Sequence, residues 1–115
     1  MGLILDYSFR IRPDHSLFSQ WAIAIARAAQ NMPALRLLSF QIHKYSYWSS
    51  EESYGFNYIA QQRDGGPPRT EWVFMCPYEQ LLGWKQPEEA SKLWKTKCGS
   101  NLVEIIISKE CSAKR

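Results

Sequence analysis

Apolar residues in this chain recur with two different periods, and the switches between those periods set the order of its secondary structure. Steps of two, typical of a strand with one buried face, occur within residues 2–12, 35–43, 54–60, 70–76 and 101–108. Steps of three and four, typical of an amphipathic helix, occur within residues 17–32 and 87–98. The sequence therefore predicts the order strand, helix, strand, strand, strand, helix, strand.

The first predicted helix has an apolar stripe and clear limits. Ser16 is placed to cap its N-terminus, and Pro33 ends it because proline disfavours helical geometry in the residue before it. A helix with one apolar side is expected to pack on a sheet or on another helix. The residues predicted to face the core are Leu17, Phe18, Trp21, Ala22, Ile25, Ala28, Ala29 and Met32.

The second predicted helix, over residues 87–98, carries several local signals that agree. Pro87 suits the first helical position, and Glu88 and Glu89 lie in the first turn, where the helix dipole favours acids. Gly99 can take the left-handed geometry that ends many helices. The basic residues gather toward the end of the helix: Lys92, Lys95 and Lys97. Its predicted buried stripe is Ala90, Leu93, Trp94 and Cys98.

Short links between the segments predict how the strands pair. A strand that follows a helix after a short link is expected to rejoin the same sheet by a crossover, and the middle three strands are expected to form an antiparallel meander. The predicted fold is a two-layer α/β (α+β) sandwich with a mixed five-stranded sheet and two helices. We expect a single domain over residues 1–115, with its core in residues 3–108 and a frayed tail from 109 to 115.

Composition limits the partners and the compartment. The net charge is +3, and acidic residues are interleaved with the basic ones, so no broad positive field for nucleic acid is expected. The three cysteines are widely spaced, and no secretory signal or run of about 20 apolar residues occurs. We therefore expect an intracellular protein, cytoplasmic or nuclear, that has no membrane association and carries free thiols.

The residues that carry most enzyme chemistry are not grouped in this sequence. His15 and His43 lie far apart, and no two cysteines have the spacing of a metal site. Gly65-Gly66 is followed by two prolines and a strand, which is the wrong context for a phosphate-binding turn. No catalytic residue, no metal and no cofactor is therefore expected.

The sequence is compatible with two ligand-binding functions. A small-molecule-binding protein or enzyme would use a pocket between the sheet and the helices, for which His43, Tyr58 and Glu104 are the candidate residues. An RNA-binding βαββαβ-like domain would use rings such as Tyr54, Phe56 and Tyr58 on a central strand, although this strand has no neighbouring Lys or Arg.

Aromatic residues outside the predicted core are the candidates for partner binding. Tyr45, Tyr47 and Trp48 follow the second strand, and Trp84 precedes the second helix. One interpretation is that these rings cover one end of the sandwich. The other is that they form an interface hot spot, because Trp and Tyr supply a large, rigid and partly polar contact area.

Four segments resemble the C-terminal region of a large group of fungal F-box-like proteins. They are "AIARAAQNMPALRLLSFQI", "YGFNY", "TEWVFMCPY" and "LWKTKCGSNLVEIII", and the resemblance covers about residues 17–107. It rests on the Met32-Pro33-Ala34-Leu35 step, on the Tyr54 to Tyr58 strand, and on Trp72 and Trp94. The F-box itself, which docks the ubiquitin-ligase adaptor, is absent from these 115 residues.

The resemblance implies a leucine-rich-repeat-like terminal unit that presents a surface to partner proteins. We therefore expect a non-enzymatic protein–protein interaction module similar to the substrate-recognition end of such proteins. The partner is expected to be a protein, and an exposed sheet edge or apolar face would also allow a homodimer.

Overall fold

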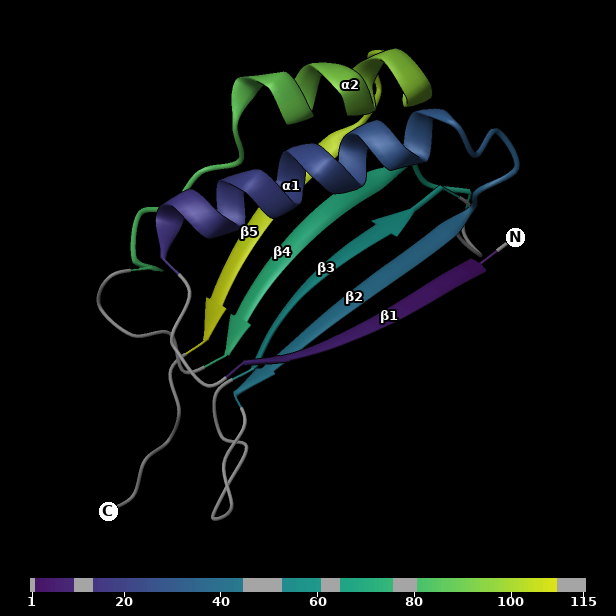
Figure 1. Cartoon of the computed structure of the whole chain (residues 1–115). Helices are drawn as coiled ribbons and strands as arrows, with labels where there is room; N and C mark the ends of the chain where they lie inside the picture. The colour runs from purple at the N-terminus through teal and green to yellow at the C-terminus, as the bar shows by residue number, and fades with distance from the viewer. Residues whose placement is uncertain (1, 10–13, 45–52, 61–64, 76–80, 110–115) are drawn as a thin grey trace.

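Five strands and two helices form two layers in the computed structural model, which describes residues 2–9, 14–44, 53–60, 65–75 and 81–109 (Figure 1). The elements, in chain order, are β1 Gly2–Phe9, α1 His15–Gln30, β2 Leu37–Lys44, β3 Ser53–Ile59, β4 Arg69–Met75, α2 Glu88–Cys98 and β5 Val103–Lys109. This confirms the predicted α+β fold and its element order. No helix of the described part is long and apolar enough to cross a membrane.

The strands lie in the sheet in the same order as in the chain, from β1 at one edge to β5 at the other. β1 pairs with β2 in parallel, and β4 pairs with β5 in parallel. β3 is antiparallel to both β2 and β4, so the middle strands form the predicted meander. It follows that β1, β2, β4 and β5 run in one direction and β3 runs in the other.

These strand directions explain why both helices cover the same face of the sheet. Each helix connects two neighbouring parallel strands, and both crossovers step across the sheet in the same sense. Because such crossovers have a fixed hand, helices that link equally directed strands in this way pack on one side. Figure 1 shows α1 and α2 side by side above the sheet, and no described helix lies below it.

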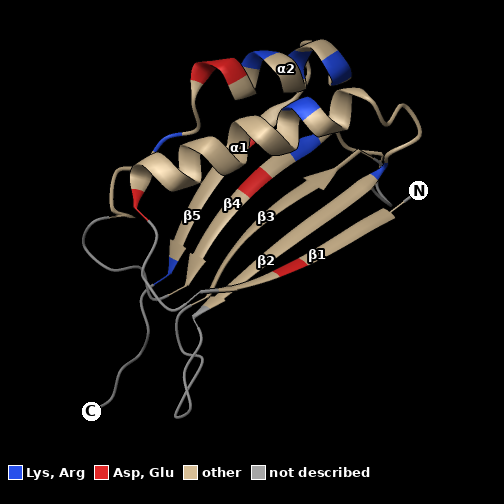
Figure 2. Ribbon diagram, in the orientation of Figure 1, with Lys and Arg blue, Asp and Glu red and all other residues tan. Residues whose placement is uncertain are grey.

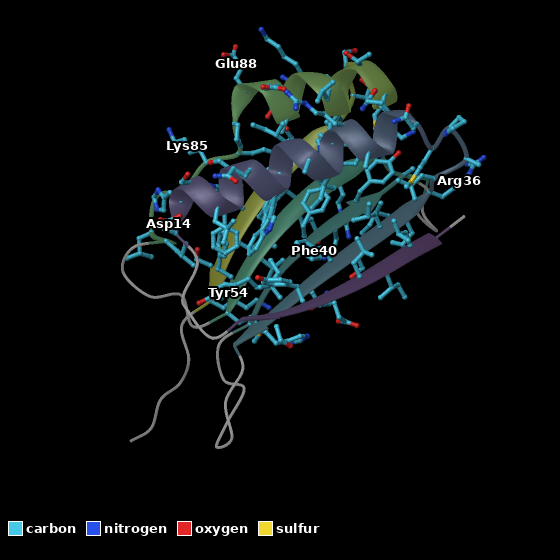
Figure 3. All side chains as sticks on the ribbon, in the orientation of Figure 1. Asp14, Arg36, Phe40, Tyr54, Lys85 and Glu88 are labelled. Carbon is cyan, nitrogen blue, oxygen red and sulfur yellow. The ribbon has the colours of Figure 1, made fainter. Side chains whose placement is uncertain are left out.

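Aromatic rings fill the space between the two layers. Phe18 of α1 contacts Tyr54, Trp72 and Phe74 edge-on, at centroid distances of 5.6, 5.7 and 5.4 Å. Phe40 and Tyr54 extend from the sheet toward α1 (Figure 3). The residues of β2, β3 and β4 that face the helices are all buried: Leu38, Phe40, Ile42, Tyr54, Phe56, Tyr58, Trp72 and Phe74.

The N-terminus of α1 differs from the prediction. The capping residue is Asp14, whose Oδ1 accepts a hydrogen bond from the backbone N–H of Leu17 at 3.0 Å. Asp14 has the extended backbone of a cap, with φ −112° and ψ −176°. Ser16 lies inside the first turn, where its Oγ accepts from the Gln20 side chain. The helix therefore begins at His15 and ends at Gln30.

The buried stripe of α1 is also narrower than predicted. Its fully buried members are Phe18, Ala22, Ala26 and Ala29. Ala28, predicted to face the core, is exposed, and Ala26, which was not in the predicted stripe, is buried. Residues 21–26 are all apolar and so fit more than one helix face, and contact with the sheet selects one of them.

α2 follows its prediction closely and is tied to α1 by polar contacts. Ala90 and Trp94 are buried, while Leu93 and Cys98 pack at the edge of the core. Gly99 has a φ of 89°, which favours glycine, but its ψ of −177° differs from the expected left-handed helical value. Arg27 of α1 forms an ion pair with Glu89 of α2. Gln30 Nε2 donates a hydrogen bond to the backbone carbonyl of Leu93, and Lys97 Nζ donates one to the backbone carbonyl of Met32, just after α1.

Candidate interaction surface

One face of the sheet carries both helices, and we call the other the open face. The pairing register places these side chains on it: Ile4, Asp6 and Ser8 of β1; Leu37, Ser39, Gln41 and His43 of β2; Ser53, Asn57 and Ile59 of β3; Arg69, Glu71, Val73 and Met75 of β4; Val103, Ile105, Ile107 and Lys109 of β5. Gly2 and Gly55 lie on the same face. The open face is thus formed by alternate residues of all five strands.

Polar side chains in the middle of the open face are bonded to each other. Asn57 Nδ2 donates to Glu71 Oε1 at 3.4 Å, and Arg69 Nε lies 2.8 Å from Glu71 Oε2. Gln41 Nε2 donates to Ser39 Oγ at 3.0 Å. These contacts orient each polar group along the sheet and neutralise the Glu71 carboxylate, so the centre of the open face carries no unpaired acid.

Apolar side chains flank this polar centre on both sides. Ile4 on β1 is 70% exposed, and its neighbour Leu37 on β2 is 41% exposed. On the opposite flank, Met75 of β4 and Val103 of β5 are also exposed. On the other side of the molecule, α2 carries acids at its start and lysines further along (Figure 2). The open face therefore offers exposed apolar area beside polar groups that are already paired.

A hollow of about 130 Å³ lies at the centre of the open face, and we call it the Gly55 hollow. Its floor is the backbone of β3 at Gly55, between Gln41 on β2 and Val73 on β4. The full lining consists of Gln41, Ser53, Tyr54, Gly55, Asn57, Val73 and Met75. The hollow exists because position 55 has no side chain while its neighbours on both strands do.

The residues predicted to bind a partner are placed only in part. Tyr45, Tyr47 and Trp48 lie outside the described residues. Trp84 is 4% exposed, contacts Trp72 at a centroid distance of 5.0 Å, and donates its indole N–H to Ser19 Oγ at 3.2 Å. Trp84 is therefore a core residue that closes one end of the space between the layers.

The three pocket candidates do not meet at one site. His43 lies on the open face, with Nε2 3.7 Å from Asp6 Oδ1. Tyr58 lies on the helix-covered face near the other end of the sheet, since it pairs with Leu38 rather than with a residue close to His43. Glu104 is in register with Tyr58 across the sheet, but Thr70 of β4 lies between them.

Tyr58 has a distinct local environment beneath α2. Its ring stacks on Trp94, and its hydroxyl accepts a hydrogen bond from Cys98 Sγ at 3.5 Å. Burial raises the pKa of Tyr58 well above its ordinary value, and the neighbouring Cys98 side chain adds to the increase. This hydroxyl therefore stays neutral in the folded protein and acts as a structural contact of the helix C-terminus.

The described residues do not have the arrangement that RNA binding or metal binding would need. The rings of Tyr54, Phe56 and Tyr58, which an RNA-binding sheet would expose for base stacking, are buried under the helices. Within the described ranges, no group of three or more His, Cys, Asp and Glu side chains could hold a metal ion. A second hollow, of about 400 Å³, runs along α2 and is lined by Glu88, Glu89, Lys92, Leu93 and Thr96.

Sequence reasoning missed the residues of the Gly55 hollow. A signal for them was present, because a glycine in a strand interior often marks a close approach of a ligand or another backbone. Gly55 and Asn57 also alternate with the buried rings of β3. The neighbours Gln41 and Val73, which make the hollow, come from strands whose register the sequence alone does not show.

Comparison with known proteins adds no relative to this description. No protein-family model matches the chain, and neither the curated proteins nor the solved structures contain a match.

Proposed function

We propose that this chain is a non-enzymatic protein–protein interaction module and that its open face binds a partner protein. The observation that carries the proposal is the one-sided arrangement of the helices, which leaves the other face of the sheet without a described element on it. This face exposes the apolar side chains of Ile4, Leu37, Met75 and Val103, and its central polar side chains are paired with each other, so a partner can cover apolar area there without stranding the Glu71 carboxylate. The resemblance to the substrate-recognition end of fungal F-box-like proteins supports the same function.

The experiment uses affinity capture from an extract of the native cells, followed by a measurement of affinity for the captured protein. Leu37→Lys and Met75→Lys change one exposed residue on each flank of the open face. Both are expected to weaken binding at least about tenfold, because a charge replaces an apolar contact. Leu82→Lys is the matched control, since Leu82 is 57% exposed and lies outside the sheet.

The outcomes of this experiment separate the candidate surfaces. Loss of binding with Leu37→Lys and Met75→Lys, and retention with Leu82→Lys, supports the open face. Equal binding by all of these variants contradicts it. A combined Tyr47→Ala and Trp48→Ala variant tests the aromatic segment, and loss with that variant alone would move the binding surface to this segment.

A second copy of the chain is a further proposed partner. β1 is an edge strand in which Ile4, Leu5 and Tyr7 are all exposed. Its residues 2–8 include one charged side chain, Asp6, and no proline, so this edge has few of the features that block pairing. We propose that β1 pairs with β1 of another copy. We also propose that the protein acts in the cytoplasm or nucleus, because an odd number of cysteines favours a reducing compartment.

A further inference from the structure

The fold itself does not require glycine at position 55. The described glycines with positive φ are Gly65, Gly83 and Gly99, so Gly55 has a backbone that other residues adopt readily. A Cβ built on Gly55 would lie 3.5 Å from Gln41 Nε2 and from the Phe40 carbonyl oxygen, which is ordinary contact. Glycine in a strand interior weakens the strand and packs no side chain. What this glycine does provide is the open volume of the Gly55 hollow.

The size of the hollow favours one inserted side chain over a whole small molecule. Its volume of about 130 Å³ is well below the roughly 300–1,000 Å³ of most ligand pockets. It opens on the face of the sheet that no described element covers. An extended segment lying across this face would present one side chain to it, as sheet surfaces do with alternate residues.

The chemistry of the lining defines that side chain. Val73 and Met75 provide an apolar wall, and a methionine sulfur favours contact with an aromatic ring. Gln41 uses its Nε2 to bond Ser39, which leaves its Oε1 to accept from a donor in the hollow. None of the lining residues is charged, so a charged side chain would lose its hydration without gaining an ion pair.

We propose that the Gly55 hollow binds a tyrosine side chain from an extended segment of the partner protein. The ring contacts Val73 and Met75, and the hydroxyl donates to Gln41 Oε1. An aliphatic or phenylalanine side chain would cover the amide of Gln41 without satisfying it, which lowers its affinity. This inference rests on the proposed function, because it names the group that the open face recognises.

The test is an NMR titration of the full chain with N-acetyltyrosinamide, N-acetylphenylalaninamide and N-acetylleucinamide. The tyrosine amide is expected to bind with millimolar affinity and to shift the side-chain amide signals of Gln41 and Asn57 and the backbone amide signal of Gly55. The phenylalanine amide is expected to bind about tenfold more weakly, since it lacks the hydroxyl donor.

Three variants make the test specific. Gly55→Val fills the hollow and is expected to abolish the shifts, and a dispersed amide spectrum checks that it has folded. Gln41→Met keeps the shape of the wall and removes the acceptor, so tyrosine and phenylalanine amides should then bind equally. Ser8→Val places a valine on the open face at the edge strand, outside the hollow, and should leave binding unchanged.

Several results would overturn the inference: no shift with the tyrosine amide, equal binding of all three amides to the wild-type chain, or binding that survives in folded Gly55→Val. The two experiments together distinguish failure of this inference from failure of the proposed function. If the amide does not bind but Leu37→Lys and Met75→Lys still lose the captured partner, the open face remains the interface and the tyrosine proposal is wrong. If the amide binds but those variants keep the partner, the proposed function is wrong.

Discussion

The rings of Tyr58 and Trp94 stack with their centroids 4.6 Å apart and their planes at 25°, and this contact joins the central strand β3 to α2. Trp94 also lies against Phe56, the next inward residue of the same strand, at 5.7 Å. Trp94 and Ala90 are the buried residues of α2, so this stack helps to hold the second helix over the sheet.

Removing the Trp94 ring is expected to destabilise the fold strongly. Trp94→Ala should lower the free energy of unfolding by about 3–5 kcal/mol, because the side chain is fully buried and the cavity left behind is large. Urea denaturation followed by circular dichroism measures the change. Leu82→Ala is the control, and its effect should stay within about 0.5 kcal/mol because the side chain is exposed. Similar effects of the two substitutions would contradict the packing of α2.

The raised pKa of Tyr58 predicts a loss of stability at alkaline pH. Above about pH 10, the ordinary value for tyrosine, the unfolded chain releases this proton while the folded chain retains it. The unfolded state then binds fewer protons, so the free energy of unfolding falls as pH rises. Tyr58→Phe should reduce this fall between pH 8 and about pH 11. Denaturant titrations of both proteins across that range check it, and parallel pH profiles would show that Tyr58 has no such role.

The capping role of Asp14 predicts different effects at two neighbouring residues. Asp14→Ala should lower stability by about 1 kcal/mol, since it removes the acceptor for the Leu17 N–H. Ser16→Ala should change stability by less than about 0.5 kcal/mol, because Ser16 lies in the first helical turn. Thermal and urea unfolding of the two variants measure this difference, and a larger effect at Ser16 would restore the sequence-based assignment of the cap.

The exposed edge of β1 predicts self-association. We expect a concentration-dependent dimer by light scattering coupled to size-exclusion chromatography. Ile4→Lys should shift it to monomer, because a lysine on an edge strand opposes strand pairing. Val103→Lys on β5 is the matched control at the other edge and should leave the dimer intact. A monomer at all concentrations, or dissociation by Val103→Lys alone, would contradict pairing through β1.

The order of the elements and the inward faces of the middle strands could be predicted from the sequence. Rings at every second position, as in Tyr54, Phe56 and Tyr58, have one arrangement that buries all of them together. The cap of α1 could not be predicted with the same certainty, because Asp14 and Ser16 are both good capping residues two positions apart. Backbone geometry decides between them.

Local sequence patterns point to Gly55 but not to the rest of the candidate site. Which face of the sheet stays uncovered depends on the relative directions of β1, β2, β4 and β5, which are strands distant in the chain. The Gly55 hollow depends on the register that sets Gln41 and Val73 beside Gly55. Periodicity within one strand carries neither kind of information.

Site-specific photo-crosslinking tests the open face most directly as the surface that binds the partner. A benzophenone amino acid replaces Ser39, in the middle of the open face, or Lys92, on the outer side of α2, and the captured partner is added before irradiation. The open-face interface predicts a crosslinked product from position 39 and none from position 92. A product from position 92 with none from position 39 would place the partner on the helical layer and contradict the proposed interface.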